Sequence, residues 1–167
     1  MIVAPVFALA LSMSAQCDPC GLLPPLPAPV DVGLSAAGGG VGAELTVISL
    51  VELGSFIGAF GGVNTEPWGI PVVLGGLFLA WPVGAVVAAS ERADLRGGSP
   101  LWVGVATGVP ATIASGVATA FFYSSLVAAD DASRSNDVLI GLGVLLGGAV
   151  VQGVAAGVVT GFTGGSE

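Results

Sequence analysis

The sequence predicts an all-α membrane protein, and three properties of its 167 residues support this prediction. Hydrophobic residues make up 54% of the chain and charged residues only 8%, whereas a soluble domain is about a quarter charged. Apolar residues form four long runs, each close to the roughly 20 residues that a helix needs to cross a hydrocarbon core of about 30 Å. All four runs are rich in glycine or alanine. We therefore expect a bundle of four Gly/Ala-rich transmembrane helices, preceded by a signal-like segment and a proline-rich linker.

The first two segments are expected to lie outside this bundle. Residues 1–15 contain an apolar stretch followed by small residues, which is typical of a secretory signal peptide or a short hydrophobic anchor. Residues 16–42 are predicted to form an extramembrane linker. Its prolines favour an extended backbone, and the glycines of 34–42 oppose helix formation.

Two cysteines, Cys17 and Cys20, stand close together in this linker. Their spacing permits a small disulfide ring, which we favour, or a C-x-x-C redox pair. The redox interpretation lacks the thioredoxin-like strand and helix that should surround such a pair, but a membrane-bound thiol oxidoreductase stays an alternative. Lipid attachment at Cys17 is a further alternative, for which Gln16 is a poor preceding residue.

The predicted helices are bounded by residues that commonly start and stop helices. Pro67 lies near the first turn of the second helix, Ser99 and Pro100 offer an N-cap and a first helical residue, and Asn136 and Asp137 can cap the fourth helix. A short tail is expected at 163–167. The four helices are predicted at 43–63, 67–90, 100–128 and 137–162.

Small residues recur four positions apart in every predicted helix. Lipid tails are as apolar as leucine, so membrane helices associate where small residues let their backbones approach. We expect these rows to be packing faces, within one bundle or between copies. The rows are Gly54, Gly58 and Gly62; Gly76, Ala80, Gly84 and Ala88; Gly104, Gly108, Thr112, Gly116, Ala120 and Ser124; and Gly153, Gly157, Gly161 and Gly165.

Two predicted helices contain internal prolines, at Pro82 and at Pro110. Each removes one backbone hydrogen bond and kinks its helix, which membrane proteins tolerate when a neighbour satisfies the freed carbonyl. The kinks are interpreted as a hinge or as a static bend that improves packing.

Two polar residues, Glu52 and Gln152, are predicted to lie inside the membrane. An ionised carboxylate is costly there, and no cation is expected at the same depth. We therefore expect Glu52 to be protonated and to donate a hydrogen bond to a neighbouring helix, with Gln152 as one possible acceptor. Glu44, by contrast, is expected near the membrane interface at the start of the first helix.

The acidic segment 130–137 has oxygen-bearing side chains at alternate positions, as the first half of a calcium loop does. It has Asn136 where the central glycine should be, and Leu142 where the bidentate glutamate should be. We therefore interpret it as a solvated helix-capping turn, and we expect no metal site.

Charge and composition exclude several functions. Eleven acidic residues and three arginines give a net charge of −8, which rules out the basic surface that binds nucleic acid. The chain has no histidine and no lysine, and so lacks the usual general base and Schiff-base nucleophile. We expect no enzymatic activity and no cofactor.

The leading hypothesis is a multi-pass integral membrane protein with a structural or assembly role, in a bacterial inner membrane or exported. Its expected partners are the lipid bilayer and a second copy or a membrane-complex partner. The alternative is a channel or transporter subunit in which Glu52 binds a proton or cation.

Overall fold

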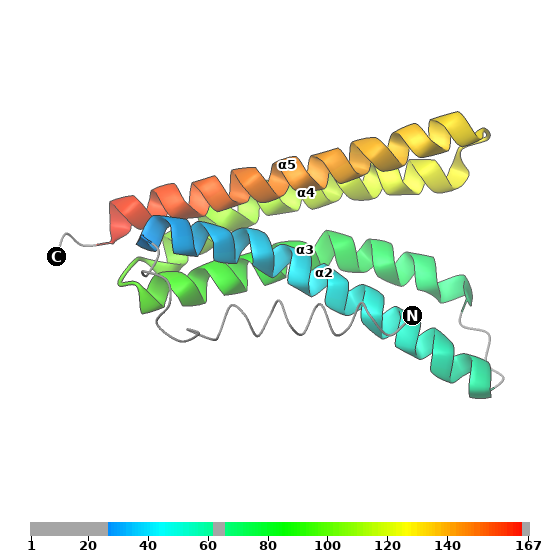
Figure 1. The fold of residues 1–167 in the computed structure, drawn as a ribbon, viewed down its shortest axis with the longest axis horizontal. Helices are drawn as coiled ribbons and strands as arrows, with labels where there is room; N and C mark the ends of the chain where they lie inside the picture. The colour runs from blue at the N-terminus through cyan, green and yellow to red at the C-terminus, as the bar shows by residue number, and fades with distance from the viewer. Residues whose placement is uncertain (1–26, 62–65, 165–167) are drawn as a thin grey trace, which may run out of the picture.

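The computed structural model describes residues 27–61 and 66–164, and these form an all-α bundle (Figure 1). No strand occurs in these two ranges. The predicted signal segment, Cys17, Cys20 and residues 165–167 lie outside the described residues. The all-α prediction is confirmed. The helices are α2 (Ala28–Gly61), α3 (Glu66–Leu95), α4 (Pro100–Val127) and α5 (Asp131–Thr163).

Each of the four helices is long and apolar enough to cross a membrane. They contain 34, 30, 28 and 33 residues. At about 1.5 Å per residue they extend about 42–51 Å, more than the roughly 30 Å of a hydrocarbon core. These lengths and compositions are those of a multi-pass membrane protein.

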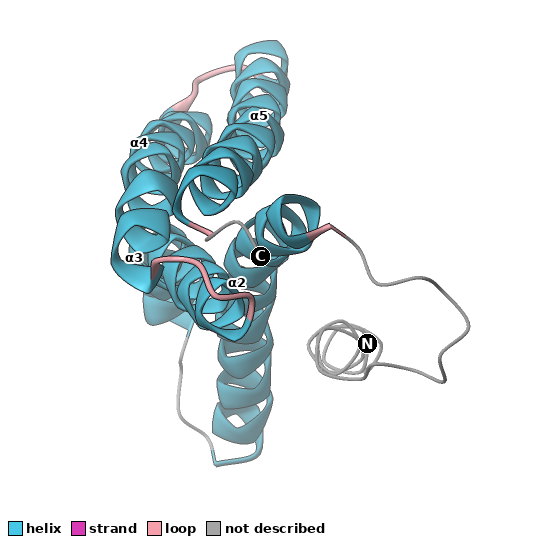
Figure 2. Cartoon of the chain, turned by 90° about the vertical axis from the view of Figure 1, so that its left-hand side faces the viewer, coloured by secondary structure: helices cyan, strands magenta, loops and turns pink. Residues whose placement is uncertain are grey.

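Successive helices run antiparallel and form a ring in which each packs mainly against two others. Helix α2 contacts α3 and α5, and α4 also contacts α3 and α5, whereas α3 and α5 barely touch. Figure 2 shows this ring along the helix axes. We call the end where α2 and α4 begin and α3 and α5 finish the arginine end, because Arg92 and Arg96 lie there. Away from it the α2–α3 hairpin diverges from the α4–α5 hairpin (Figure 1).

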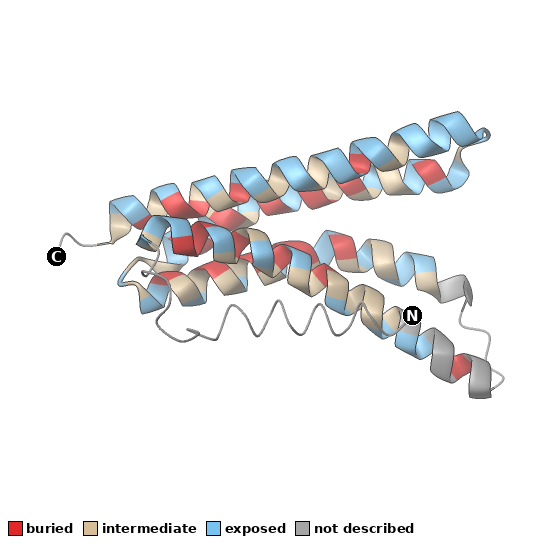
Figure 3. Ribbon diagram, viewed as in Figure 1, coloured by how far each residue is buried: buried red, intermediate tan, exposed pale blue. Residues whose placement is uncertain are grey.

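The buried core is made mostly of alanine, because the helices approach too closely for larger side chains. One cluster near the arginine end includes Val32, Ala36 and Val103. A second cluster, farther from that end, includes Leu77 and Trp81. Buried positions follow the inner faces of the helices, and exposed positions cover the outer faces (Figure 3). The exposed side chains are largely Leu, Val, Ile and Phe, as expected of a surface that faces lipid.

Helix α2 begins at Ala28, so the prediction of a linker up to residue 42 is wrong over its last part. Pro29 lies in the first turn of α2, where a missing N–H breaks no helical bond. The amides of Val30 and Asp31 already donate to the carbonyl of Pro27, at 2.9 and 3.0 Å. The glycines of 34–42 remain helical because neighbouring helices pack directly against this stretch, which offsets their low helix propensity.

The turn between α3 and α4 is closed by Gly97, whose φ is +71°. The amide of Gly97 donates to the carbonyl of Asp94 at 3.1 Å, and the amide of Gly98 donates to that of Ala93 at 2.8 Å. This pair of bonds is a Schellman motif, which requires a residue that adopts positive φ without strain. It directs the chain straight into α4.

The beginnings of α4 and α5 confirm one predicted cap and correct another. Ser99 is the N-cap of α4, although its side chain makes no cap bond, and Pro100 is the first helical residue as expected. Helix α5 begins at Asp131, and its cap is Asp130 rather than Asn136 or Asp137. Hydrogen bonds from the amide and the hydroxyl of Ser133, at 2.7 and 2.8 Å, lower the pKa of Asp130. Most of the segment predicted as a turn is therefore helix, because capping by Asp130 lets the helix start earlier.

Candidate functional site

Gln152 is a central polar contact of the bundle. Its side chain is fully buried on α5 and lies between α2 and α3. Its amide nitrogen donates to the carbonyl oxygen of Ala36 at 3.0 Å, and its amide oxygen accepts from the indole nitrogen of Trp81 at 3.3 Å. One side chain thus connects three helices. Gln152 lies within the apolar span of α5, and its hydrogen-bond partners are Trp81 and Ala36.

Replacing Gln152 with leucine is expected to destabilise the bundle by about 1–2 kcal/mol, in the upper part of the range for interhelical hydrogen bonds in membranes. The indole N–H of Trp81 would stay buried without an acceptor, which adds a desolvation cost. Reversible unfolding in detergent measures the change. The exposed Val151→Leu on the same helix is the matched control. Equal stability of Q152L and wild type would contradict the role of this contact.

The carbonyl freed by Pro82 is bonded by a neighbouring helix. Proline at position 82 removes the amide that would bond the carbonyl of Phe78, four residues earlier. The single hydroxyl hydrogen of Ser115 on α4 is shared between that carbonyl, at 3.5 Å, and the carbonyl of Thr112 on its own helix, at 3.1 Å. Pro82 is therefore accommodated by a long polar contact with α4, which fits a static bend.

Asp31 holds two arginines together at the arginine end. Its Oδ2 accepts from Nε of Arg92 and from Nε of Arg96, both at 2.8 Å, and it lies 2.6 Å from a terminal guanidinium nitrogen of Arg96. The Asp31 side chain is only 10% exposed, while the arginine side chains are 34% and 31% exposed. The carboxylate in the first turn of α2 and the arginines at the end of α3 each lie where the helix dipole favours their charge. This ion pair joins the two helices of one hairpin.

Glycines of α5 and α3 allow α2 to lie with its backbone against theirs. A Cβ on Gly153 would lie 2.9 Å from the carbonyl oxygen of Gly33, and one on Gly157 would lie 2.6 Å from that of Pro29. A Cβ on Gly84 would overlap the carbonyl oxygen of Gly39, and the reverse holds as well. Two faces of α2 are thus in backbone contact with neighbouring helices.

The remaining predicted packing glycines have looser surroundings. Cβ atoms on Gly104, Gly108 and Gly116 would meet only side chains of α3, at 2.8, 3.0 and 3.5 Å. Around Gly54 there is open space, Gly58 is buried, Gly161 lies near the Pro29 ring, and Gly62 is outside the described residues.

Glu44 lies deeper in α2 than the sequence predicts. Because α2 begins at Ala28, Glu44 rather than Glu52 lies near its middle. The apolar span of α2 contains Glu44. Glu44 is 8% exposed, and its Oε2 has no hydrogen-bond partner among the described residues. The side chain of Glu52 is outside the described residues, so its predicted hydrogen bond stays a prediction.

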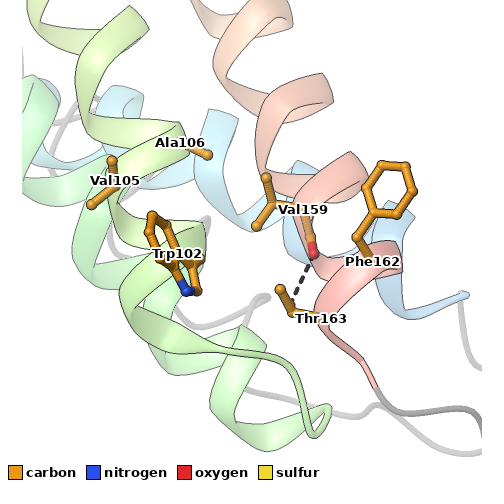
Figure 4. Close-up of a pocket in the computed structure, with 6 residues that line it drawn as sticks. All are labelled: Trp102, Val105, Ala106, Val159, Phe162 and Thr163. Carbon is orange, nitrogen blue, oxygen red and sulfur yellow. Dashed lines mark hydrogen bonds between the residues drawn. The ribbon is translucent and has the colours of Figure 1, made fainter.

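An apolar depression lies between α4 and α5 at the arginine end (Figure 4). Trp102 on α4 and Phe162 on α5 stand on its two sides. The hydroxyl of Thr163 donates to the carbonyl of Val159 at 2.9 Å and accepts from the amide of Ser99 at 3.2 Å, so its bonding capacity is used locally. The depression offers apolar contact, and the residues that line it carry no charge. They are Trp102, Val105, Ala106, Val159, Phe162 and Thr163.

Comparison with protein-family models, with curated proteins and with solved structures found no match to this chain. Its function is therefore argued from the contacts above. Within the described ranges, no three carboxylate or cysteine side chains are grouped so that they could hold a metal ion.

Sequence reasoning missed three of these residues. Asp31 falls within the predicted linker, Trp81 is not among the predicted site residues, and Glu44 is predicted near an interface. A signal for Asp31 was present, because an acidic residue two positions after a proline is typical of a first helical turn. No local signal relates Trp81 to Gln152, because 71 residues separate them.

Proposed function

We propose that this protein is a structural or assembly component of a membrane and is not an enzyme. Interior polar side chains that form hydrogen bonds between helices are the observation that supports this role. Gln152, Trp81 and Ser115 bond from helix to helix, and these bonds hold the bundle in one arrangement. Buried polar groups that join elements in this way favour a unique packing. A bundle that is held in one arrangement by such bonds is suited to present fixed outer faces to other membrane helices.

One outer face of α5 is suited to such lateral contact. Gly143 and Gly147 are exposed, four residues apart, and no atom lies within 4 Å of where their Cβ atoms would be. Leu139 and Leu146 beside them are about two-thirds exposed. Small residues with this spacing let a second helix approach closely in lipid. We infer that helices of a second copy or of another membrane protein pack here.

Self-association in liposomes tests this proposal. Donor- and acceptor-labelled copies of the full chain are reconstituted together, and energy transfer is measured against dilution in lipid. G147L is expected to weaken association about tenfold, which corresponds to about 1.4 kcal/mol. The control is G38L, because Gly38 on α2 is equally open but lies on another helix. Association that is absent, or that G147L and G38L weaken equally, would contradict self-association through α5.

The same liposomes distinguish the channel alternative. Proton flux is followed with an enclosed pH-sensitive dye under an imposed gradient. A structural component is expected to give no flux above that of protein-free liposomes. Flux that depends on protein would overturn the structural proposal and favour a channel or transporter subunit.

A further inference from the structure

We propose that Glu44 is a proton-binding site inside the bundle and that its bound proton is required for α2 to pack against α3 and α5. Neither the fold nor the proposed structural role explains why a glutamate stands at position 44.

The position of Glu44 places its side chain inside the bundle. Glu44 lies on the packed side of α2, one helical turn after Gly40. A Cβ on Gly40 would lie 2.9 Å from the indole of Trp81, and Ala43 and Val47, on either side of Glu44, lie against Gly84 and Gly76 of α3. The carboxyl group therefore lies inside the bundle, with Oε2 shielded from solvent and without a hydrogen-bond partner among the described residues.

Among the described residues of the helices that pack against α2, no compensating charge lies at this depth. Helix α3 has no charged residue between Gly69 and Ser90, and α5 has none between Val138 and Thr163. Arg92 of α3 and Arg96 just after it are bonded to Asp31 at the arginine end, and Arg134 of α5 lies at the opposite end. The charged residues of α3 and α5 are all near helix ends: Glu66, Glu91, Arg92 and Asp94 on α3, and Asp131, Arg134 and Asp137 on α5.

An ionised, unpaired carboxylate in such surroundings is very costly, so the group must be neutral or must bind a cation. A metal cation needs several oxygen ligands. Glu44 is the only acidic side chain at this depth in the described residues, and no metal-holding group occurs among them. A proton needs one oxygen only. The ligand of Glu44 is therefore a proton.

Loss of this proton leaves a negative charge between α2 and its neighbours. The O–H bond of the carboxylic acid breaks, the proton passes to water or hydroxide, and the carboxylate keeps the electron pair. The charge is then stabilised only if α2 moves or water enters. Glutamine at position 44 has the same shape and no proton to lose, so E44Q keeps the neutral packing at every pH.

Infrared spectroscopy of the full chain in liposomes tests whether the proton is present. At about pH 7, where an ordinary glutamate is ionised, wild type is expected to show the carbonyl band of a protonated carboxylic acid that shifts in heavy water. The band should lose intensity in E44Q. In E52Q, the control on the same helix, any contribution of Glu52 is removed and the Glu44 component should remain. Absence of the band in wild type, or an unchanged band in E44Q, would overturn the proposal.

Unfolding in detergent tests whether the proton is required for packing. Between about pH 6 and about pH 9, wild type is expected to lose at least tenfold in its folding equilibrium relative to E44Q measured in the same range. An equal loss in both proteins would overturn the packing requirement.

A third measurement, chemical labelling of the wild-type protein, needs no variant. Dicyclohexylcarbodiimide adds to a protonated carboxyl in apolar surroundings, taking the acid proton onto its nitrogen, and mass spectrometry locates the adduct. An adduct at Glu44 supports the proposal, whereas adducts confined to other carboxyls contradict it.

Discussion

Replacing Gly84 with alanine is expected to separate α2 from α3 and to destabilise the bundle by about 1–3 kcal/mol, the usual cost of an atom forced into a filled site. The added Cβ would overlap the carbonyl oxygen of Gly39 and lie 2.5 Å from the Cβ of Ala43. A backbone carbonyl cannot rotate away as a side chain can, so the whole of α2 would have to shift. Gly39→Ala makes the reciprocal overlap and should have a similar effect.

Gly75→Ala is the matched control for this prediction, because Gly75 lies on the same helix with open space around it. Alanine has the higher helix propensity, so G75A should be neutral or slightly stabilising. Reversible unfolding of the three variants in one detergent gives the comparison. If G84A and G75A were equally stable, backbone contact at Gly84 could not be what holds α2 against α3.

Replacing Asp31 with asparagine is expected to cost about 1–3 kcal/mol, less than a fully buried ion pair would, because both arginines are about one-third exposed to solvent. Asparagine keeps the size of the side chain but removes the charge that Arg92 and Arg96 share. The two guanidinium groups would then repel each other beside the start of α2. The loss should be greatest at that end of the helix, where amide hydrogen exchange of the first turn is expected to accelerate.

Glu91→Gln serves as the control, since Glu91 is exposed, adjacent to Arg92 and in no ion pair in the described part of the chain. It should leave stability and exchange unchanged. Combining D31N with R92Q should restore part of the lost stability, because one of the two unpaired cations is then gone. Equal effects of D31N and E91Q would show that general surface charge, and not the Asp31 contact, matters at this end.

Much of the fold was predictable because length and polarity alone identify an apolar helix. The predicted 100–128 nearly coincides with α4, since Pro100 marks its start without help from other helices. The start of α2 was not predictable. Prolines and glycines of 24–42 have low helix propensity, and this local preference is overridden at Gly33 and Gly39 by contacts with α5 and α3. Because α2 begins at Ala28 and not at the predicted residue 43, Glu44 lies near the middle of the helix. Glu44 thereby becomes a candidate site that the sequence did not indicate.

The sequence by itself determined that four apolar helices would form and that glycine would let them approach, because both follow from composition over short windows. Only the tertiary structure decided which glycines touch, that Asp31 joins Arg92, and that Gln152 reaches Ala36. These contacts connect residues that are 61 and 116 positions apart. Their partners are chosen by how the helices are arranged around the ring, and a local pattern carries no information about that arrangement.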